Sequence, residues 1–421
     1  MFLFKKPKFI FLLLFIISNI YSCLYFINTG HLLGEVSDFN FKSEETSIYI
    51  NLLIIFFYLF FLVVIFRFFS KIHVNSLLDN DCRIKWCKAE FFWGKLLIII
   101  QILFIFYFCL TNTFGANSVN RDGGIISALW VVLSPDNLFF IYYSIFRKSR
   151  YAKYNLLLAI LSNILRGWSG ILIFIVFIEL CYRYREGKLK IRLLSKICGI
   201  MFLLYPVLLA VKYGIRDSFL TNSNFWESFD RSWLYVFNNN GVLGYINGLL
   251  FGIEQFFSRI QLFSNAVVVY SLKHELANFV ITNKVTSYWQ EGIYGIIWNR
   301  IFDLPTSYNL GEVLANFIDP QSIIGSWNSN PTFLSWLFID PFQIGIYLLF
   351  TIALCFITMF LVKKITSSTL SLDMLWYMWL ILIMPGWFAS LILFLNTLII
   401  FYVITFIKLN VTIERQLWWG K

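Results

Sequence analysis

Charged side chains are scarce in this sequence, and acidic ones are scarcer than basic ones. Only 14% of the 421 residues are charged, with 23 Asp and Glu against 34 Lys and Arg. A soluble domain carries about 25% charged residues, so the composition argues against an ordinary soluble fold. The acids form no cluster of the kind that holds Mg²⁺, and the sequence predicts no metal site and no cofactor.

Two other patterns are missing. The seven cysteines are scattered, and the close pair Cys82 and Cys87 has no second pair of zinc-type spacing. No small-residue cleavage site follows the apolar run after Lys5, Lys6 and Lys8. We therefore expect a first membrane span there and not a cleaved signal peptide.

Long apolar runs recur from one end of the chain to the other, and 59% of the residues are hydrophobic. A helix needs about 20 apolar residues to cross a bilayer, with a lower limit near 17. The sequence therefore predicts an all-α polytopic membrane protein with about ten transmembrane helices. The expected spans are 8–28, 48–68, 95–115, 124–146, 154–165, 167–184, 191–213, 341–362, 372–388 and 389–408.

Two of the apolar runs are interrupted. The run 154–184 is too long for one span and short for two, and it breaks at Arg166-Gly167. The run 372–408 breaks in the same way at Pro385-Gly386. Broken helices are tolerated at membrane depth where the free backbone lines a cavity within the protein. We therefore expect two pairs of short helices at these positions.

Basic residues concentrate on alternate loops, and this sets the expected orientation. With the N-terminus inside, most of the 34 Lys and Arg fall on the inner side, and both termini lie there. Ten remain outside: Lys42, Arg121, Arg166, Lys212, Arg216, Arg231, Arg259, Lys273, Lys284 and Arg300. The net charge of +11 is then mostly a topology signal, and we expect no nucleic-acid partner.

One long segment, 213–331, is expected on the outer side and is rich in aromatic and amide side chains. It separates residues 1–212, with seven spans, from residues 332–421, with a re-entrant segment and three spans. Loops of this length are usually functional. Its tryptophans either form an interfacial belt or stack on sugar faces.

Within that segment, residues 246–272 predict one amphipathic helix. Its polar residues follow the spacing of a single helical face: Glu254, Ser258, Gln261 and Asn265. Arg259 lies beside that face, and apolar residues cover the opposite one. Such a helix lies at the membrane interface or re-enters the bilayer.

The few outer cations suggest a binding site. Arg166 lies at the first helix break, Lys212 and Arg216 share a helix face at the outer end of the seventh span, and Arg259 lies on the amphipathic helix. If these four converge, they form a cationic pocket at the outer membrane boundary. Arginine binds phosphate oxygens bidentately and stays charged. The pocket would suit a lipid pyrophosphate, and its cations would stabilise that group as it leaves without a metal.

Each cation also has an ordinary alternative role. Arg166 can cap a turn, or its side chain can extend to the lipid headgroups. The side chain of Lys212 can also extend to the headgroups. Arg216 can be an interfacial anchor, and Arg259 can serve only to make its helix amphipathic. Ionisable groups at membrane depth are functional by default, which favours a role in binding for Arg166 and Arg216.

Transfer of a sugar also needs a general base to activate the attacking hydroxyl. The outer candidates are Glu254, His274, Glu275, Glu312, Asp319 and Asp340. Glu254 is one helical turn from Arg259, so a structural ion pair is the competing role. His274 lies in a charged turn, where plain solvent exposure competes. Asp136, next to Pro135 in the fourth span, is expected to face the bundle interior.

Two stretches resemble a known family. The stretch ILRGWSGILIFIVFIEL is similar to the Ser-Arg-Gly element of the bacterial O-antigen polymerase (Wzy-type) and O-antigen ligase group, with Leu165 where Ser is usual. The stretch SNPTFLSWLFIDPFQIGIYLLF is similar to the re-entrant segment of repeat-unit polymerases, through Thr332-Phe333, Asp340 and Gly345. Arg216 after the next span and the large late outer loop add to the resemblance.

The resemblance implies a GT-C-like integral-membrane glycosyltransferase in the bacterial inner membrane. The donor would be a glycan on undecaprenyl pyrophosphate, transferred as a block to a new lipid-linked repeat unit on the periplasmic side. Arg166 and Arg216 would hold the pyrophosphate, with Arg259, Lys212, Asp340 and His274 as further substrate contacts and Glu254 as a catalytic candidate. Its partners would be the lipid-linked oligosaccharide, membrane lipid and a chain-length regulator.

Other functions remain open. An O-antigen ligase shares the chemistry and differs in acceptor, but the ligase histidine has no clear counterpart, because His274 lies in a different local context. A flippase or transporter of lipid-linked oligosaccharide is expected to show internal repeats and charges along a mid-membrane path. A non-catalytic scaffold would leave the arginines below the membrane surface unexplained.

Overall fold

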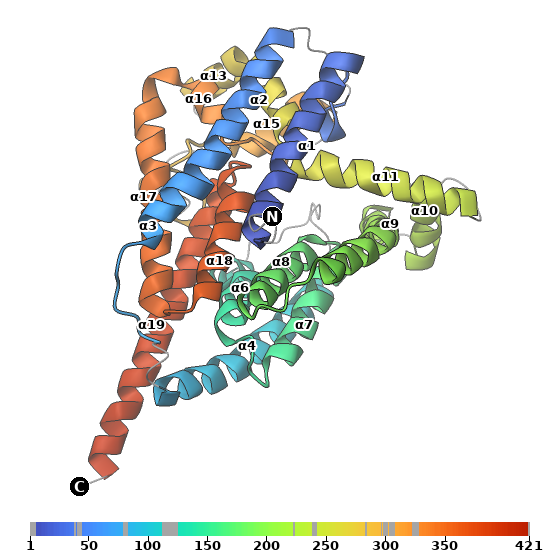
Figure 1. Cartoon of the computed structure of the whole chain (residues 1–421). Coiled ribbons are helices and arrows are strands. Elements are labelled where there is room, and N and C mark those ends of the chain that lie inside the picture. The colour runs from blue at the N-terminus through green and yellow to red at the C-terminus, as the bar shows by residue number, and fades with distance from the viewer. Residues whose placement is uncertain are drawn as a thin grey trace.

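The protein is almost entirely helical in a computed structural model, and its helices form one bundle with a lateral arm (Figure 1). The structure describes residues 6–37, 39, 44–78, 83–111, 125–221, 224–237, 242–282, 284–295, 297, 302, 308–321 and 328–419. Across these ranges no strand is formed, and extended pairing is limited to two isolated bridges, Leu78 with Thr366 and Val285 with Tyr308.

Six helical stretches in the described ranges are long and apolar enough to cross a membrane. They are Pro7–Val36, Glu45–Ser70, Ile84–Thr111, Ile126–Phe146, Pro341–Ile365 and Phe388–Asn410. Two shorter apolar helices, Ala152–Leu165 and Thr369–Ile383, accompany them. The chain is thus a multi-pass helical membrane protein, which confirms the predicted class, while the number of ten spans and the orientation stay predictions.

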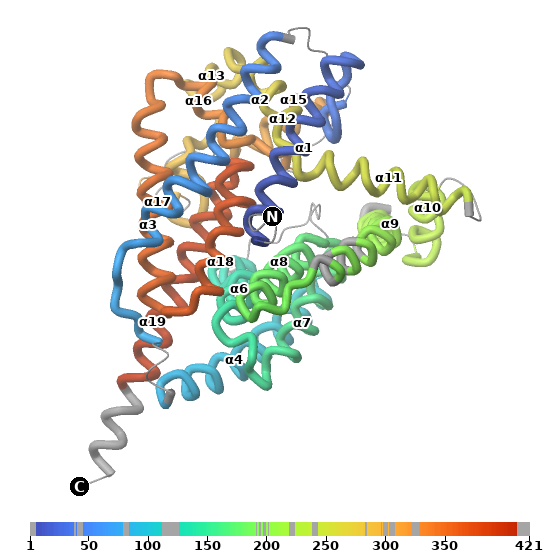
Figure 2. The backbone as a smooth tube through the Cα atoms, viewed as in Figure 1, coloured from blue at the N-terminus to red at the C-terminus, as the bar shows by residue number. Residues whose placement is uncertain are grey.

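The bundle consists of helices from both ends of the chain. Its helices are α1 (Pro7–Thr29), α2 (Glu44–Leu59), α3 (Phe66–Ser70), α4 (Arg83–Thr111), α5 (Ile125–Leu133), α6 (Pro135–Phe146), α7 (Ala152–Leu165), α8 (Gly170–Arg185), α17 (Ile344–Ile365), α18 (Thr369–Met378) and α19 (Phe388–Trp419). The rings of Phe69 in α3 and Phe356 in α17 pack together with centroids 5.5 Å apart, and Figure 2 shows α4, α6, α7 and α8 as a second group below.

Aromatic side chains fill the core of this bundle, and the indole nitrogens of two buried tryptophans find partners. Trp93 of α4 stacks on Phe401 of α19 with ring centroids 4.2 Å apart, and its Nε1 donates to Thr405 at 2.8 Å. Trp376 Nε1 donates to the carbonyl oxygen of Leu62 at 3.0 Å. Leu62 lies in a π-helical turn, Phe60–Ile65, between α2 and α3. Such turns leave carbonyls without their usual helical partner, so the tryptophan satisfies one of them.

The two predicted breaks are present, but the second does not separate two short helices, because α19 continues from Phe388 to Trp419 and is long enough to cross a membrane by itself. Helix α7 ends at Leu165 and α8 begins at Gly170, with Gly167 in the left-handed region at φ 67°. After α18 and a π-helical turn, Trp379–Ile383, the chain turns at Pro385-Gly386 before α19. Gly386 also has a left-handed backbone, φ 77°, which a glycine adopts without steric cost.

A third break interrupts the fourth predicted span, 124–146, which the sequence predicts as one continuous span. Ser134 separates α5 from α6 with φ 40°, an unusual conformation for a residue other than glycine. Asn396 of α19 donates to the carbonyl oxygen of Val132, at the end of α5, at 3.2 Å. A distant helix therefore supplies a partner for backbone freed by the break.

The segment similar to a re-entrant element packs into the second predicted break. The amide of Thr332 donates to the carbonyl oxygen of Pro385 at 2.8 Å, and that of Phe333 donates to Met384 at 2.9 Å. The short helix α16 (Ser335–Ile339) follows, then a 3₁₀ turn, Pro341–Gln343, before α17. The segment is mostly buried, so it completes the interior of the bundle.

A lateral arm projects from the bundle in Figure 1. It consists of α9 (Ile191–Thr221), α10 (Phe225–Phe237) and α11 (Val242–Ile260). The arm has a small hydrophobic core of its own, with buried residues Leu209, Ala210, Val236 and Phe237. Because α9 is one helix through Thr221, the predicted boundary of the seventh span at residue 213 does not correspond to a helix end.

The prediction of a single helix over 246–272 is wrong. Helix α11 ends at Ile260, and α12 (Phe263–Ser271) begins after a break at Gln261 and Leu262. Asn19 of α1 stabilises the break, because its Oδ1 accepts hydrogen bonds from the amides of Leu262 at 2.8 Å and Phe263 at 3.0 Å. Gln261 and Asn265 are consequently buried, and they do not continue the polar face that bears Glu254.

The remaining described helices of the long segment cover the bundle beside α16. They are α13 (Lys273–Ile281) and α15 (Leu310–Ile318). Asn309 and Glu312 form a capping box at the start of α15, in which each side chain accepts a hydrogen bond from the backbone of the other. Asn265 of α12 donates to Ser329 and to the carbonyl oxygen of Asn330, both at 3.0 Å, which ties α12 to the chain leading into α16.

Candidate cationic site

The break between α7 and α8 meets α9 at Gly167. A side chain at Gly167 would lie 3.3 Å from Cγ of Arg216 and 3.7 Å from the carbonyl oxygen of Lys212. The glycine therefore does two things: it adopts the left-handed turn, and it leaves room for Arg216 to lie across the turn. The sequence left open whether Arg166 and Arg216 meet, and the structure brings Gly167, the neighbour of Arg166, against the side chain of Arg216.

Arg166 caps this turn and has a strong partner within the chain. Its Nη2 donates to both carboxylate oxygens of Asp136 at 2.9 and 2.8 Å, and its Nε donates to the carbonyl oxygen of Ser162 at 3.2 Å. Asn163 also donates to Asp136 at 2.8 Å. The guanidinium lies 4.8 Å from the ring centroid of Trp168 and 5.0 Å from that of Phe104. Its side chain is only 11% exposed, so the arginine is held rigidly.

Arg216 differs from Arg166 because its Nε is buried and has no hydrogen-bond partner in the described part of the chain. Its neighbours are other cations. The charge of Arg259 lies close enough to repel both Arg216 and Lys212, and Arg216 also repels Lys212. A buried donor without a partner costs about 1–3 kcal/mol, so Arg216 is a candidate contact for a ligand.

Arg259 completes the site from α11 and forms an ion pair with Glu35 at 2.6 Å. Glu35 lies in a short turn, Gly34–Val36, after α1. This turn is fixed against α11 and α12: Cβ at Gly34 would be 3.4 Å from Cβ of Ser258, and the amide of Leu33 donates to Ser264 at 3.1 Å. The pair is more exposed than the Arg166 pair, with 45% of Arg259 and 35% of Glu35 accessible.

We call Arg166, Lys212, Arg216 and Arg259 the cation cluster. Its members come from the α7–α8 break, from α9 and from α11. Two carboxylates accompany it: Asp136 neutralises Arg166, and Glu35 neutralises Arg259. Lys212 and Arg216 lie in the part of the cluster that has no ion pair of its own among the described residues. The arrangement can therefore bind an anion with two or more phosphate oxygens.

The other predicted site residues lie apart from these contacts. Glu254 is exposed on α11 and forms no ion pair with Arg259, whose partner is Glu35. His274 is exposed on α13. Asp340 is half-buried at the end of α16, beside Tyr288, whose pKa it helps to raise after the larger effect of burial. No described contact joins these three residues to the cation cluster, and their roles stay predictions.

Sequence reasoning missed both counter-ions of the cluster. Asp136 was expected to face the bundle interior, but its partner was not identified. Two opposite charges in neighbouring apolar runs are a usable signal, since an isolated charge at that depth is expensive and pairing relieves it. Glu35 offered no such signal, because its contact with Arg259 joins residues that are far apart in the sequence.

Glu291 is a second residue that the sequence did not single out. It is 7% exposed and lies next to α19, where a side chain at Gly292 would be 3.2 Å from Cα of Ala389. Burial raises the pKa of Glu291 to about 8, a hydrogen bond from the Ala389 backbone lowers it, and Glu312 raises it further. The carboxyl is therefore largely protonated at neutral pH. No described contact places it near the cation cluster.

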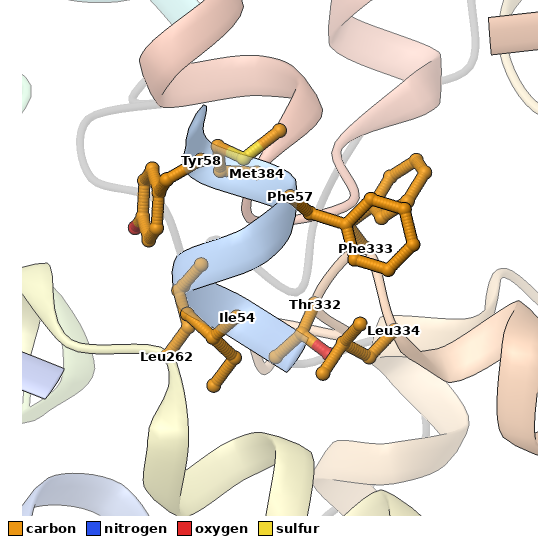
Figure 3. Close-up of a pocket in the computed structure, with 8 residues that line it drawn as sticks. All are labelled: Ile54, Phe57, Tyr58, Leu262, Thr332, Phe333, Leu334 and Met384. Atoms are coloured by element: carbon orange, nitrogen blue, oxygen red, sulfur yellow. The ribbon is translucent and has the colours of Figure 1, made fainter. Parts of the chain in front are cut away.

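A small pocket among the described residues is apolar, and no residue of the cation cluster lines it. It is lined by Ile54, Phe57, Tyr58, Leu262, Thr332, Phe333, Leu334 and Met384 (Figure 3). Phe57 and Phe333 face each other there, with ring centroids 4.9 Å apart. Because none of the predicted site residues lines it, we regard this pocket as a packing gap at the junction of α2, α12 and the re-entrant-like segment.

A second group of charges lies at the ends of α1, α6, α8 and α18. Asp373 is buried and accepts from Lys8 at 2.8 Å and from Arg185 Nε at 2.7 Å. Glu179 accepts from Arg147 Nε at 2.6 Å and from Tyr143 at 2.7 Å. We call these residues the paired network. Lys8, Arg147 and Arg185 are all cations that the sequence assigned to the inner side.

The composition of the site limits the groups that it can hold. Within the described ranges, no three His, Cys, Asp or Glu side chains gather in a way that could hold a metal ion. In comparisons with known proteins, no family model, no curated protein and no solved structure matches the chain. Function is therefore inferred from the residues and their geometry.

Proposed function

We propose that the chain is a metal-independent glycosyltransferase that polymerises lipid-linked repeat units. The donor is a glycan on undecaprenyl pyrophosphate, and the acceptor is a new lipid-linked repeat unit at the outer face of the bacterial inner membrane. The observation that supports the proposal is the approach of three cations, Lys212, Arg216 and Arg259, beside the broken helix at Gly167. Among them, Arg216 has a buried Nε without a hydrogen-bond partner in the described part of the chain.

The reaction transfers a glycan from one oxygen to another. A hydroxyl oxygen of the acceptor attacks the anomeric carbon of the donor glycan, and the bond from that carbon to the pyrophosphate oxygen breaks. The electron pair stays on the pyrophosphate, which gains one negative charge, and the hydroxyl proton passes to a base. Preorganised cations stabilise this developing charge, and the gain is large where water is excluded.

The residues of the cation cluster have different parts in this scheme. Arg216 and Lys212 contact the pyrophosphate, because they have no carboxylate partner of their own. Arg259 contacts it from α11 while it keeps Glu35 as a neighbour. Arg166 fixes the turn against which Arg216 lies, so it positions the site. The general base is not assigned among the described residues.

The test is a glycan ladder from cells that lack the gene and carry a variant. Arg216→Ala should leave lipopolysaccharide with a single repeat, while membrane levels of the protein stay normal. Arg231→Ala is the matched control, because Arg231 is also an outer arginine, with an exposed ion pair to Asp217 at 2.6 Å. It should give a full ladder. A full ladder from Arg216→Ala would refute the assignment of the site.

A flippase for lipid-linked oligosaccharide is the second candidate. The three interrupted spans, at Ser134, Gly167 and Gly386, favour it, because broken helices commonly form substrate sites in transporters. Deletion of the gene separates the candidates. Loss of a polymerase leaves core with one repeat, loss of a flippase leaves repeat units inside the cell, and loss of a ligase leaves polymer on its lipid carrier.

A further inference from the structure

Glu35 is the carboxylate that lies beside the part of the cation cluster formed by α9 and α11. Its Oε1 accepts a hydrogen bond from Nη1 of Arg259 at 2.6 Å. Its charge also lies close enough to attract Lys212 and Arg216. One carboxylate therefore acts on three cations, Lys212, Arg216 and Arg259, which we call the cation trio.

The cation trio lies where α9 and α11 pack against each other. The ring of Tyr205 in α9 packs edge-on against that of Phe256 in α11, with centroids 5.8 Å apart, and a side chain at Gly252 would lie 3.3 Å from Tyr205. The charge of Arg259 acts on Tyr205 as well. Glu35 reaches this junction of two helices from a third part of the chain, the turn after α1.

The turn that carries Glu35 is held by contacts other than its carboxylate. The amide of Leu33 donates to Ser264 at 3.1 Å, Val36 is buried, and Gly34 adopts the left-handed backbone that the turn requires, φ 84°. The ion pair of Glu35 is partly exposed, and exposed pairs contribute little to stability. Stability of the turn therefore does not account for a carboxylate at this position.

The charges beside Glu35 can be counted directly. Arg216 and Arg259 carry fixed positive charges, and Lys212 adds a third when an anion is bound beside it. Three positive charges and the one negative charge of Glu35 leave a net charge of +2. A lipid-pyrophosphate glycan is a diester and carries two negative charges, which this net charge matches. The released lipid pyrophosphate is a monoester and carries about three near neutral pH.

The product of the proposed reaction is thus more negative than its substrate, and an unopposed cation trio would hold it tightly. We infer that Glu35 is a positioning residue that offsets part of the charge of the cation trio through Arg259, so that the released lipid pyrophosphate can leave the site. This inference rests on the proposed function. Glu35 competes with phosphate oxygens for the guanidinium of Arg259, and it lowers the attraction of Lys212 and Arg216 for the same anion.

Glu35→Gln in the full-length purified protein tests this inference, because the amide oxygen can still accept from Arg259 while the negative charge is removed. Farnesyl pyrophosphate is the probe, as a short lipid pyrophosphate monoester that resembles the product. We expect Glu35→Gln to bind it about fivefold more tightly than the wild type at low salt, with a smaller gain at high salt. With lipid-linked repeat units as substrate, KM and kcat should both fall, because release becomes slower.

Two further variants serve as controls. Glu35→Asp keeps the charge and should bind the probe as the wild type does. Asp217→Asn removes the acid of a matched ion pair, since Asp217 pairs with Arg231 at the same distance, 2.6 Å, and with similar exposure. Asp217 follows Arg216 in the sequence, but successive residues of a helix do not face each other. Affinity, KM and kcat should stay unchanged in Asp217→Asn.

Several results would overturn the inference. They are unchanged or weaker probe binding by Glu35→Gln, an equal gain in affinity for Glu35→Asp or Asp217→Asn, and an unchanged or higher kcat for Glu35→Gln. Loss of folded Glu35→Gln protein would also overturn it, because Glu35 would then serve stability.

Failure of the proposed function gives a different pattern. If the wild type binds farnesyl pyrophosphate and Arg216→Ala does not, the site is a pyrophosphate site whatever Glu35 does, and only the inference about Glu35 is decided by its variants. If neither the wild type nor Glu35→Gln binds the probe, the proposed function fails, and the inference fails with it.

Discussion

The cation cluster and the paired network consist of the same kinds of residues and differ in how their charges are satisfied. In the paired network, buried Asp373 accepts from two cations, and Glu179 accepts from Arg147 and Tyr143. In the cation cluster, two of the four cations pair with a carboxylate, and the Nε of Arg216 is buried without a hydrogen-bond partner among the described residues. Charges that are satisfied within the chain hold helices together, whereas unsatisfied ones are available to a ligand.

The largest effects are expected when one charge is removed from the paired network and one from the cation cluster. Asp373→Asn should destabilise the protein by about 3 kcal/mol, because it leaves Lys8 and Arg185 beside a neutral group. Arg216→Ala should have the opposite profile, with normal stability and no polymer. Thermal unfolding in detergent and polymer formed per folded molecule measure the two effects. If Asp373→Asn keeps its stability and loses polymer, the two groups do not differ as described.

Gly167→Ala tests the contact between the break and Arg216. The new Cβ would lie in a left-handed backbone and 3.3 Å from Cγ of Arg216, so we expect a loss of about 1–2 kcal/mol and displacement of Arg216. Polymer should shorten without being abolished. Gly187→Ala is the control, since Gly187 has φ 69° but no atom within 4 Å of a new Cβ. It should show a similar backbone cost with normal polymer, and equal polymer loss in both variants would contradict the role of the contact.

Glu291 sharpens the comparison because it is a buried acid that forms no ion pair with any described cation. Burial raises its pKa to about 8 in the folded chain, while the unfolded chain loses the proton near its ordinary value of 4.5. Between these values the folded state holds the extra proton, so stability falls as pH rises, by at most about 1.4 kcal/mol per pH unit. It levels off above pH 8.

Glu291→Gln removes this titration. Thermal unfolding of the wild type should decline between pH 5 and pH 8, and the variant should show a smaller decline over the same range. Equal slopes for the two proteins would show that Glu291 is ionised in the folded state. In that case, the fold would hold a buried carboxylate that has no cation as partner. A buried charge without a partner would then not indicate a ligand site, and the distinction between the paired network and the cation cluster would not hold.

Glu254→Gln should have the smallest effect. Glu254 is exposed and is not the partner of Arg259, so its removal should change stability by less than about 0.5 kcal/mol. It also lies outside the described contacts of the cation cluster, so we expect polymer length to stay unchanged. Abolished polymer at normal protein levels would instead support the catalytic role that the sequence suggested for this residue.

The sequence predicted local features well and long-range partners poorly. The breaks at Arg166-Gly167 and Pro385-Gly386 follow from residues that interrupt an apolar run, and both are present. The break between α11 and α12 was missed, because it depends on hydrogen bonds to Asn19, which is distant in the sequence. The spacing of the polar residues alone predicted one continuous helix, but the tertiary contact with Asn19 favours two separate helices.

The same limit applies to the candidate site. Arg166 and Arg216 could be chosen from the sequence, because a permanent charge in or beside an apolar run is expensive and needs a reason. The counter-ions of Arg166 and Arg259 could not be assigned, because Asp136 and Glu35 reach these arginines only in the folded chain. Glu254 was named as an outer acid that could act as the base, and its spacing from Arg259 suggested an ion pair as the competing role. Arg259 instead pairs with Glu35 from another part of the chain.

Binding of farnesyl pyrophosphate to the purified full-length protein tests the central claim most directly. The wild type and Arg231→Ala should bind it with equal affinity, and binding should weaken at high salt because it depends on charge. Arg216→Ala should bind at least about tenfold more weakly. If Arg216→Ala binds as tightly as the wild type, or if the wild type does not bind the probe, the cation cluster is not a pyrophosphate site.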